Sequence, residues 1–249
     1  MPNVQPGLLR TLDRARLSAF AAERGVPLDD DALFRFEAFE ESLYEANEIV
    51  NLTRVPREEC WLRHFLDSLL IAPLLPHGAM VLDIGAGPGF PAWPLANARP
   101  DLQIAAIDSN GKMLSFLRSQ DLPNLEVIQG RAEEWDEREA FDIVTGRALA
   151  PLPIQLEISA ALVKLGGAVI PMRTPNDDPE DVDFGPLGIR LEEVPEVNLP
   201  VLDAARTFPI SRKIARTQQA DPRRWSDIKA APLVRRGRGP EIDEFGSGE

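Results

Sequence analysis

The pattern of hydrophobic and polar positions predicts alternating strands and helices from residue 80 onward. Short apolar runs, typical of buried strands, lie at 80–84, 102–107, 125–129, 141–145 and 168–172. Helical spacing of apolar positions occurs at 91–98, 112–117 and 153–164, and the glycine pair 166–167 would end the last of these helices. Strands that alternate with helices through short connections form parallel sheets. With two further strands expected within 188–210, we predict an α/β fold with a seven-stranded, mostly parallel sheet flanked by helices.

Three helices are expected before the first strand, over 8–24, 29–49 and 57–75. We therefore expect residues 1–78 to be a small helical extension packed on an α/β domain of residues 79–212. Residues 213–249 form a basic C-terminal tail, which we expect to be irregular beyond Asp221 and disordered from about Gly237. Pro209 has to lie at an edge or a bulge of the sheet, because proline has no amide hydrogen to donate.

A glycine-rich segment follows the first predicted strand. The strand ends at Asp83, and Gly85, Gly87 and Gly89 come after it at alternate positions, directly before a helix. Such a turn needs positive φ angles and lets a ligand approach the backbone, so it indicates a nucleotide-like ligand. The dinucleotide fingerprint is not matched, because Phe90 stands where its third small residue would fall. The spacing instead resembles the first motif of Rossmann-like methyltransferases that use S-adenosylmethionine (SAM).

A second acidic residue, Asp108, stands at the carboxyl end of the next predicted strand. A carboxylate at this place can accept hydrogen bonds from both ribose hydroxyls of an adenosine cofactor. NAD enzymes use the same arrangement, so Asp108 does not choose between the two cofactors. The segment Asp108-Ser109-Asn110 is also suited to capping the following helix, which is compatible with the first interpretation.

Charge is distributed unevenly along the 249 residues. The formal net charge of −13 argues against a polyanionic partner, yet residues 206–238 contain ten Lys or Arg against two acids, a local charge of +8. This asymmetry predicts a local nucleic-acid contact, and a solvated basic surface is the alternative. The single cysteine, Cys60, excludes a disulfide framework, and the chain has neither a leader-like apolar segment nor an apolar run of membrane-spanning length. We expect a cytoplasmic protein.

Several blocks occur in a fixed order along the chain. They are Asn51-Leu52-Thr53, residues 63–68 (RHFLDS), residues 82–91 (LDIGAGPGFP), Asp108-Ser109 with Lys112, Arg131-Ala132-Glu133, residues 147–152 (RALAPL), and Pro222-Arg223-Arg224 with Pro232-Leu233. The glycine motif alone would be unspecific, but together and in this order the blocks resemble the RsmG (GidB) family, the bacterial methyltransferases of small-subunit ribosomal RNA.

The resemblance implies a Rossmann-like class I methyltransferase that moves a methyl group from SAM to N7 of guanine 527 in 16S rRNA. The product would be S-adenosylhomocysteine, and no metal is expected. The substrate would be rRNA in the 30S subunit or an assembly intermediate, and we expect the enzyme to act as a monomer. With the glycine motif, it implies a cofactor site of Asp83, Gly85, Gly87, Gly89, Phe90, Asp108, Ser109, Asn110, Ala132, Glu133 and Arg147. With the basic segment, it implies catalytic positions Asn51, His64 and Arg147, and RNA-binding positions Lys112, Arg131, Arg173, Arg206, Arg212, Arg223 and Arg224.

The chain departs from the family pattern in four places. Ala92 replaces a glycine after the glycine loop, Arg173-Thr174 replaces Lys-Gly, Ser226 replaces a glycine in the tail, and the last strand is less apolar than usual. The Arg173 change keeps the charge but alters its geometry.

The expected chemistry needs no general base, because guanine N7 carries a free lone pair and the donor is already a sulfonium. The protein has to align the reactants and exclude water. His64 is then an orienting group or a structural residue, and Asp67 is expected to bond to the backbone or to Arg63. The alternatives are a NAD-dependent oxidoreductase, a SAM-dependent enzyme acting on another RNA, a protein or a small molecule, and a non-catalytic ribosome-binding protein.

Overall fold

The computed structural model describes residues 14–177, 179, 182–199, 204–217 and 223–234. Its main sheet has seven strands in the order β3-β2-β1-β4-β5-β9-β6, and β9 runs antiparallel to both of its neighbours. The predicted α/β fold with a mostly parallel seven-stranded sheet is confirmed. The strands are β1 Met80–Ile84, β2 Gln103–Asp108, β3 Leu125–Gln129, β4 Phe141–Thr145, β5 Val163–Val169, β6 Ile189–Glu193 and β9 Ile210–Lys213.

The central strands β1, β2 and β4 are buried on both faces, which explains why they are largely apolar runs. Successive residues of one strand belong to different cores: Val81 packs in the first and Leu82 in the second. The first core contains residues of α4 (Ala92–Ala98) and α5 (Gly111–Arg118), and the second contains residues of α6 (Leu152–Ala160). The helices therefore cover the two faces separately and leave the carboxyl ends of the strands open.

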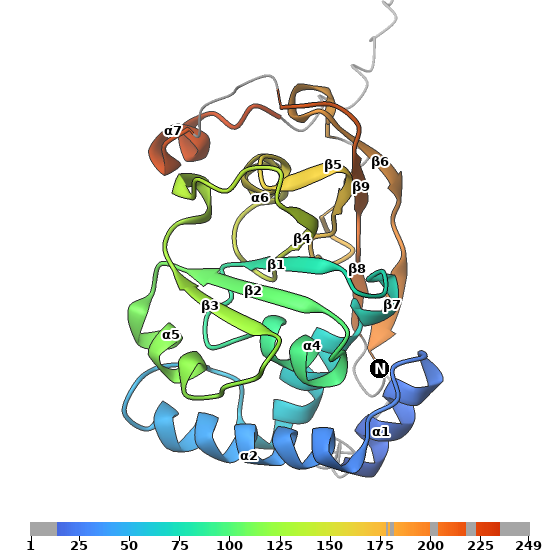
Figure 1. The fold of residues 1–249 in the computed structure, drawn as a ribbon, viewed down its shortest axis with the longest axis vertical. Helices are drawn as coiled ribbons and strands as arrows, with labels where there is room; N and C mark the ends of the chain where they lie inside the picture. Colours follow the sequence, from blue (N-terminus) through green and yellow to red (C-terminus); the bar gives the residue numbers. More distant parts are fainter. Residues whose placement is uncertain (1–13, 178, 180–181, 200–203, 218–222, 235–249) are drawn as a thin grey trace, which may run out of the picture.

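Helices α1 (Arg14–Glu23) and α2 (Asp30–Asn47) lie along the side of the sheet that α4 covers (Figure 1). Asp29 caps α2 by accepting a hydrogen bond from the amide of Ala32, at 2.7 Å. The rings of Phe36 and Phe39 pack against Trp93 of α4, with centroids 5.6 and 4.2 Å away. The N-terminal helices are thus joined to the first core by aromatic contacts.

The segment expected as one long helix over 57–75 is divided into four short pieces. They are the 3-10 turn η1 (Arg57–Glu59), the π-helix η2 (Trp61–Leu66), α3 (Asp67–Leu69) and the 3-10 turn η3 (Ala72–Leu74). Apolar spacing does not distinguish a π-helix from an α-helix over two turns, so the sequence did not reveal the change. π-Turns are frequent at functional sites, and this one carries the first four residues of the RHFLDS block, Arg63 to Leu66.

The end of the domain differs from the expectation in three respects. Gly166 and Gly167 do not cap α6, which ends at Ala160; they lie inside β5, where a side chain on Gly167 would come 2.6 Å from the carbonyl oxygen of Asp142. Residues 188–210 supply β6 and also a separate hairpin of β7 (Glu196–Leu199) and β8 (Ala204–Thr207), and Pro209 precedes β9.

The third difference lies beyond Asp221, where a short helix, α7 (Trp225–Ala230), replaces the irregular structure that was expected. The expected disorder from Gly237 lies outside the described residues. Within the part of the chain that the structure describes, no helix has the length and apolar character needed to cross a membrane.

Candidate functional site

The glycine loop turns sharply after β1. Gly85 has φ +72°, a conformation that side-chain-bearing residues rarely adopt. A Cβ at this position would also lie 2.5 Å from Cδ1 of Leu149. The backbone conformation therefore favours glycine here, and a side chain would have to displace the end of Leu149.

Asp83 is fully buried beneath this loop. Its Oδ2 accepts a hydrogen bond from the backbone amide of Ala92 at 3.0 Å, and its Oδ1 has no partner among the described residues. Burial raises the pKa of Asp83 to about 8. Ala92 stands where the family has glycine, but it still forms this hydrogen bond with Asp83, because the donor is its backbone amide. A buried carboxyl oxygen without a partner fits a cofactor whose polar end reaches the loop.

Asp108 holds the glycine loop to the end of β2. Its Oδ2 accepts from the amide of Gly87 at 2.9 Å, and its Oδ1 accepts from the amide of Asn110 at 2.7 Å. The cap of α5 is Asn110, which accepts from the amides of Lys112 and Met113. The helix-capping role expected for this segment therefore belongs to Asn110. Asp108 keeps further lone pairs, with which it could accept hydrogen bonds from a ligand.

A cavity of about 220 Å³ lies at the carboxyl ends of β1, β2 and β3. It brings together five residues expected to bind the cofactor, namely Gly85, Asp108, Ser109, Ala132 and Glu133. Arg131, expected to bind RNA, also lines it, as do Ile158 of α6 and Trp225 of α7. Ligands of open α/β sheets bind at this edge.

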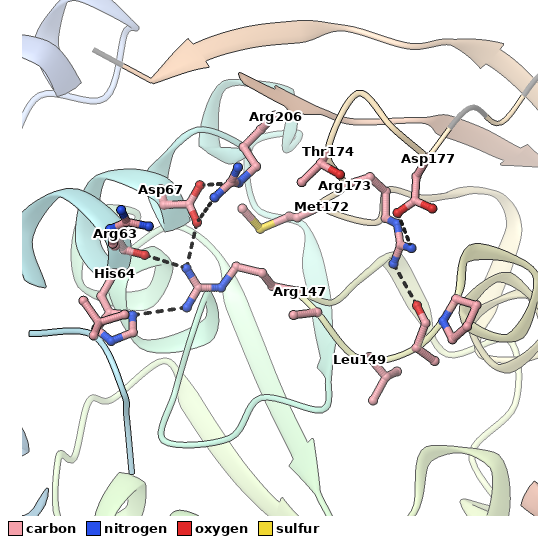
Figure 2. Close-up of a pocket in the computed structure, with 14 residues that line it drawn as sticks. Arg63, His64, Asp67, Arg147, Leu149, Met172, Arg173, Thr174, Asp177 and Arg206 are labelled. Atoms are coloured by element: carbon pink, nitrogen blue, oxygen red, sulfur yellow. Dashed lines mark hydrogen bonds and ion pairs between the residues drawn. The ribbon is translucent and has the colours of Figure 1, made fainter. Parts of the chain in front are cut away.

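A second cavity, of about 550 Å³, lies beside the first and has a different character. Figure 2 shows its charged side chains, which come from η2, α3, the loop after β4, the loop after β5, and β8. They are Arg63, Asp67, Arg147, Arg173, Asp177 and Arg206, with His64 beside them.

Asp67 is the centre of this second cavity. Its side chain is 2% exposed and pairs with two arginines: Nη1 of Arg147 lies 2.9 Å from Oδ2, and Nε of Arg206 lies 2.8 Å from Oδ1. Arg147 also donates to the carbonyl oxygen of Arg63 at 2.9 Å. Two guanidinium groups on one carboxylate leave a net positive charge at the cavity. The expected bond of Asp67 to Arg63 is not what the structure shows; partners distant in the sequence take that place.

His64 is buried, and its ring stacks on Phe90 at a centroid distance of 4.0 Å. Its Nε2 lies 2.7 Å from Oγ1 of Thr53, and its Nδ1 lies 3.3 Å from Nη2 of Arg147. Arginine only donates, so Nδ1 accepts and the proton resides on Nε2. Burial, with the charge of Arg147, lowers the pKa of His64 to about 3. The imidazole is therefore neutral and engaged at both nitrogens, which suits an orienting group and not a base.

The two cavities meet at Leu149, which lines both. Leu149 follows Ala148, whose φ of +53° is unusual for a residue with a side chain. Arg173 supports the same loop: it is 8% exposed and donates to the carbonyl oxygen of Ala150 at 2.9 Å and to Oε1 of Gln155 at 3.0 Å. Arg173 thus holds the partition between the cavities, and its RNA-binding role stays a prediction.

The remaining predicted residues lie outside the second cavity. Asn51, Lys112 and Arg224 are exposed and line neither cavity. Arg212 is paired with Glu192 at 2.9 Å, and Arg223 with Glu157 at 2.8 Å.

Of the other expected cofactor residues, Arg147 lines the second cavity, and Phe90 lines neither but stacks on His64. The remaining ones, which line neither cavity, are Asp83, Gly87, Gly89 and Asn110. Sequence reasoning missed Trp225 and Leu149 as lining residues. Leu149 lies within the RALAPL block at residues 147–152, whereas nothing in the sequence placed Trp225 near the glycine loop.

Comparison with known proteins gives a consistent result. The model of the family described as rRNA small subunit methyltransferase G matches residues 33–186. A relative from Acetivibrio thermocellus, named ribosomal RNA small subunit methyltransferase G, is 35% identical over 84% of this chain and 92% of its own length. One of the same name from Bacillus subtilis is 32% identical over 85% and 95%. A chain of the solved complex containing the Haloferax volcanii Trm112 methyltransferase activator covers 70% of this chain and 97% of its own, at TM-score 0.51 and 15% identity, which supports the fold.

Proposed function

Since this chain belongs to the family of rRNA small subunit methyltransferase G, a family of SAM-dependent enzymes, we propose that it methylates N7 of guanine 527 in 16S rRNA. The observation that carries the proposal is the contact of two unlike cavities at Leu149. One has the carboxylates and glycines that suit an adenosine cofactor, and the other has the arginines that suit a phosphate-bearing substrate. Because the two cavities adjoin, a methyl donor in one and the N7 of a guanine in the other can come into direct contact at their border.

The first cavity would hold SAM, which supplies an electrophilic methyl group when bound. Asp108 can accept hydrogen bonds from the ribose hydroxyls through its remaining lone pairs. Asp83 lies buried beneath the glycine loop and lines neither cavity, so it would support the loop through its hydrogen bond with Ala92. Gly85 leaves the backbone open to the ligand, and Leu149 lies at the border with the second cavity.

The second cavity would hold the target guanosine. Its N7 lone pair needs no deprotonation, so a neutral His64 with both nitrogens engaged agrees with catalysis by alignment. The net positive charge left by Arg147 and Arg206 around Asp67 suits a backbone phosphate beside the target. A target base has to be presented outside its stack, and the cavity of about 550 Å³ gives it space.

We infer that the substrate is an assembled or assembling 30S particle in the cytoplasm and that the enzyme acts on it as a monomer. A protein with a formal net charge of −13 gains little from unspecific attraction to free RNA. A shaped particle instead supplies specific contacts for the exposed Lys112 and Arg224.

The test is transfer of tritiated methyl from SAM to 30S subunits of a strain without the endogenous enzyme, with N7 methylation mapped at guanine 527. A single stoichiometric mark is expected, absent with Gly87→Asp, which puts a second carboxylate beside Asp108. Cys60→Ala is the control, because Cys60 is buried and lines neither cavity. SAM binding without any incorporation into RNA would refute the substrate and keep the cofactor.

The same assay separates the alternatives. Incorporation into free RNA, protein or small molecules with none into 30S subunits would favour a SAM-dependent enzyme of another substrate class. Single-turnover transfer, with enzyme in excess over 30S subunits, distinguishes an enzyme from a ribosome-binding protein that keeps SAM for stability.

A further inference from the structure

The cofactor cavity has a wall that the glycine loop and the strand ends do not supply. Trp225, the first residue of α7, lines this cavity together with Ala132 and Ile158. Its ring is partly buried and packs against the second core, to which Ala132 and Ile158 also belong. A segment more than ten residues beyond the last strand of the sheet thus reaches the site.

The chemistry of the cavity is divided between its lining residues. Asp108 presents a carboxylate, which suits ribose hydroxyls, whereas Ala132, Ile158 and Trp225 present apolar and aromatic surface. Adenine is flat and has a π-face, and bases bind by stacking on aromatic side chains. With the ribose at Asp108, the base has to lie against the apolar part of the lining.

We propose that Trp225 binds the adenine of the cofactor, so that the C-terminal helix α7 completes the cofactor site. This inference rests on the proposed SAM site and adds a residue and an element to it. Trp225 is then a cofactor-binding residue, and the segment around it is a working part of the enzyme.

α7 is held firmly enough to present a side chain in one position. Arg223 pairs with Oε1 of the buried Glu157 at 2.8 Å, and its Nη2 donates to the carbonyl oxygens of Asp227 and Ala231. Oε2 of Glu157 accepts from the amide of Leu233 at 2.6 Å. One carboxylate of α6 therefore fixes the chain on both sides of α7, next to Ile158 of the cavity. A preorganised aromatic wall loses little entropy when a ligand binds.

The test measures binding of S-adenosylhomocysteine and of 5′-methylthioadenosine, which lacks the amino-acid part, by calorimetry without RNA. Trp225→Ala should weaken both ligands by a similar factor, about tenfold or more, because the lost contact is with the base that they share. Trp225→Phe should keep most of the affinity. Trp135→Ala is the matched control, since Trp135 also packs partly buried against the second core but lines a different cavity.

A folded Trp225→Ala protein that binds both ligands as the wild type does would overturn the proposal. Should that variant not fold, tryptophan fluorescence decides: the emission change on adding S-adenosylhomocysteine should vanish in Trp225→Phe and remain in Trp135→Phe, and its persistence in Trp225→Phe overturns the proposal. Wild-type protein that binds neither ligand would refute the SAM site itself. Normal binding without methyl transfer to 30S subunits would refute only the rRNA substrate.

Discussion

The two cavities share Leu149 and yet are built in opposite ways. The polar side of the smaller one depends on the glycine loop after β1 and on Asp108 at the end of β2, which are joined by a hydrogen bond between residues only 21 apart in the chain. The larger one depends on Asp67, Arg147 and Arg206, which come from three distant segments. The first is a local structure that the fold positions, and the second exists only once the fold is complete. Changes in the two cavities should therefore have different consequences.

Gly85→Ala should have the largest effect on the cofactor cavity. The new Cβ would lie 2.5 Å from Cδ1 of Leu149 and would displace that side chain at the border of the cavity, so we expect binding of S-adenosylhomocysteine to weaken by at least about tenfold, measured by calorimetry. Gly78→Ala is the matched control, because Gly78 has φ +71° against +72° for Gly85 and a Cβ there meets nothing within 4 Å. Equal weakening in both variants would contradict a local steric cause.

Asp67→Asn should show the opposite pattern. The buried carboxylate holds two arginines that are themselves partly exposed, so its loss should destabilise the fold by about 2–3 kcal/mol, below the usual range for a fully buried pair. Urea unfolding measures this change. Methyl transfer to 30S subunits should fall far more than binding of S-adenosylhomocysteine, which should stay within a few-fold. A parallel loss of both would show that the two cavities are not independent.

His64, beside the second cavity, should make the stability of the fold depend on pH in acid. Its pKa is lowered to about 3 in the fold, so below pH 6.5 the unfolded chain takes up a proton that the native state does not. The His64 contribution to stability is therefore constant above pH 6.5 and declines below it, by about 1.4 kcal/mol at pH 5.5. Urea unfolding of wild type and His64→Gln at pH 7.5 and 5.5 should reveal this difference.

His77→Gln is the control for that measurement, since the side chain of His77 is 91% exposed. The same neutrality predicts that the rate of methyl transfer has no inflection from His64 between pH 6 and 8. An inflection in this range that is lost in His64→Gln would contradict the neutral orienting role.

The smallest effect is expected at the far wall of the cofactor cavity. Arg223→Ala removes one of the two bonds by which Glu157 holds the segment around α7, so binding of S-adenosylhomocysteine should weaken by roughly three- to tenfold without RNA present. Arg223→Lys should recover part of the loss. Arg224→Ala is the adjacent control, because Arg224 is exposed and lines neither cavity. A loss confined to RNA methylation, with unchanged cofactor binding, would instead assign Arg223 to RNA.

Apolar periodicity was sufficient for most of the fold. It placed the first four strands, the helices α4 and α5, and the core positions of α2, because burial on both faces of a parallel sheet leaves a continuous apolar run. It was misleading where backbone geometry decided the outcome. The close approach of Gly167 to Asp142 placed the glycine pair within β5, and the π-helix at Trp61–Leu66 follows the same spacing as an α-helix.

What the sequence by itself determined is the glycine loop with Asp83 and Asp108, since neighbours in the chain build it and each residue type has a local reason. Only the tertiary structure decided which partners the charged and aromatic side chains contact. Asp67 meets Arg206 across 139 residues, Arg223 meets Glu157 across 66, and Trp225 reaches the cavity beside Ala132. Ion pairs and ring contacts depend on distances in space. For residues far apart in the chain, these distances are set by the folded structure and cannot be read from the sequence.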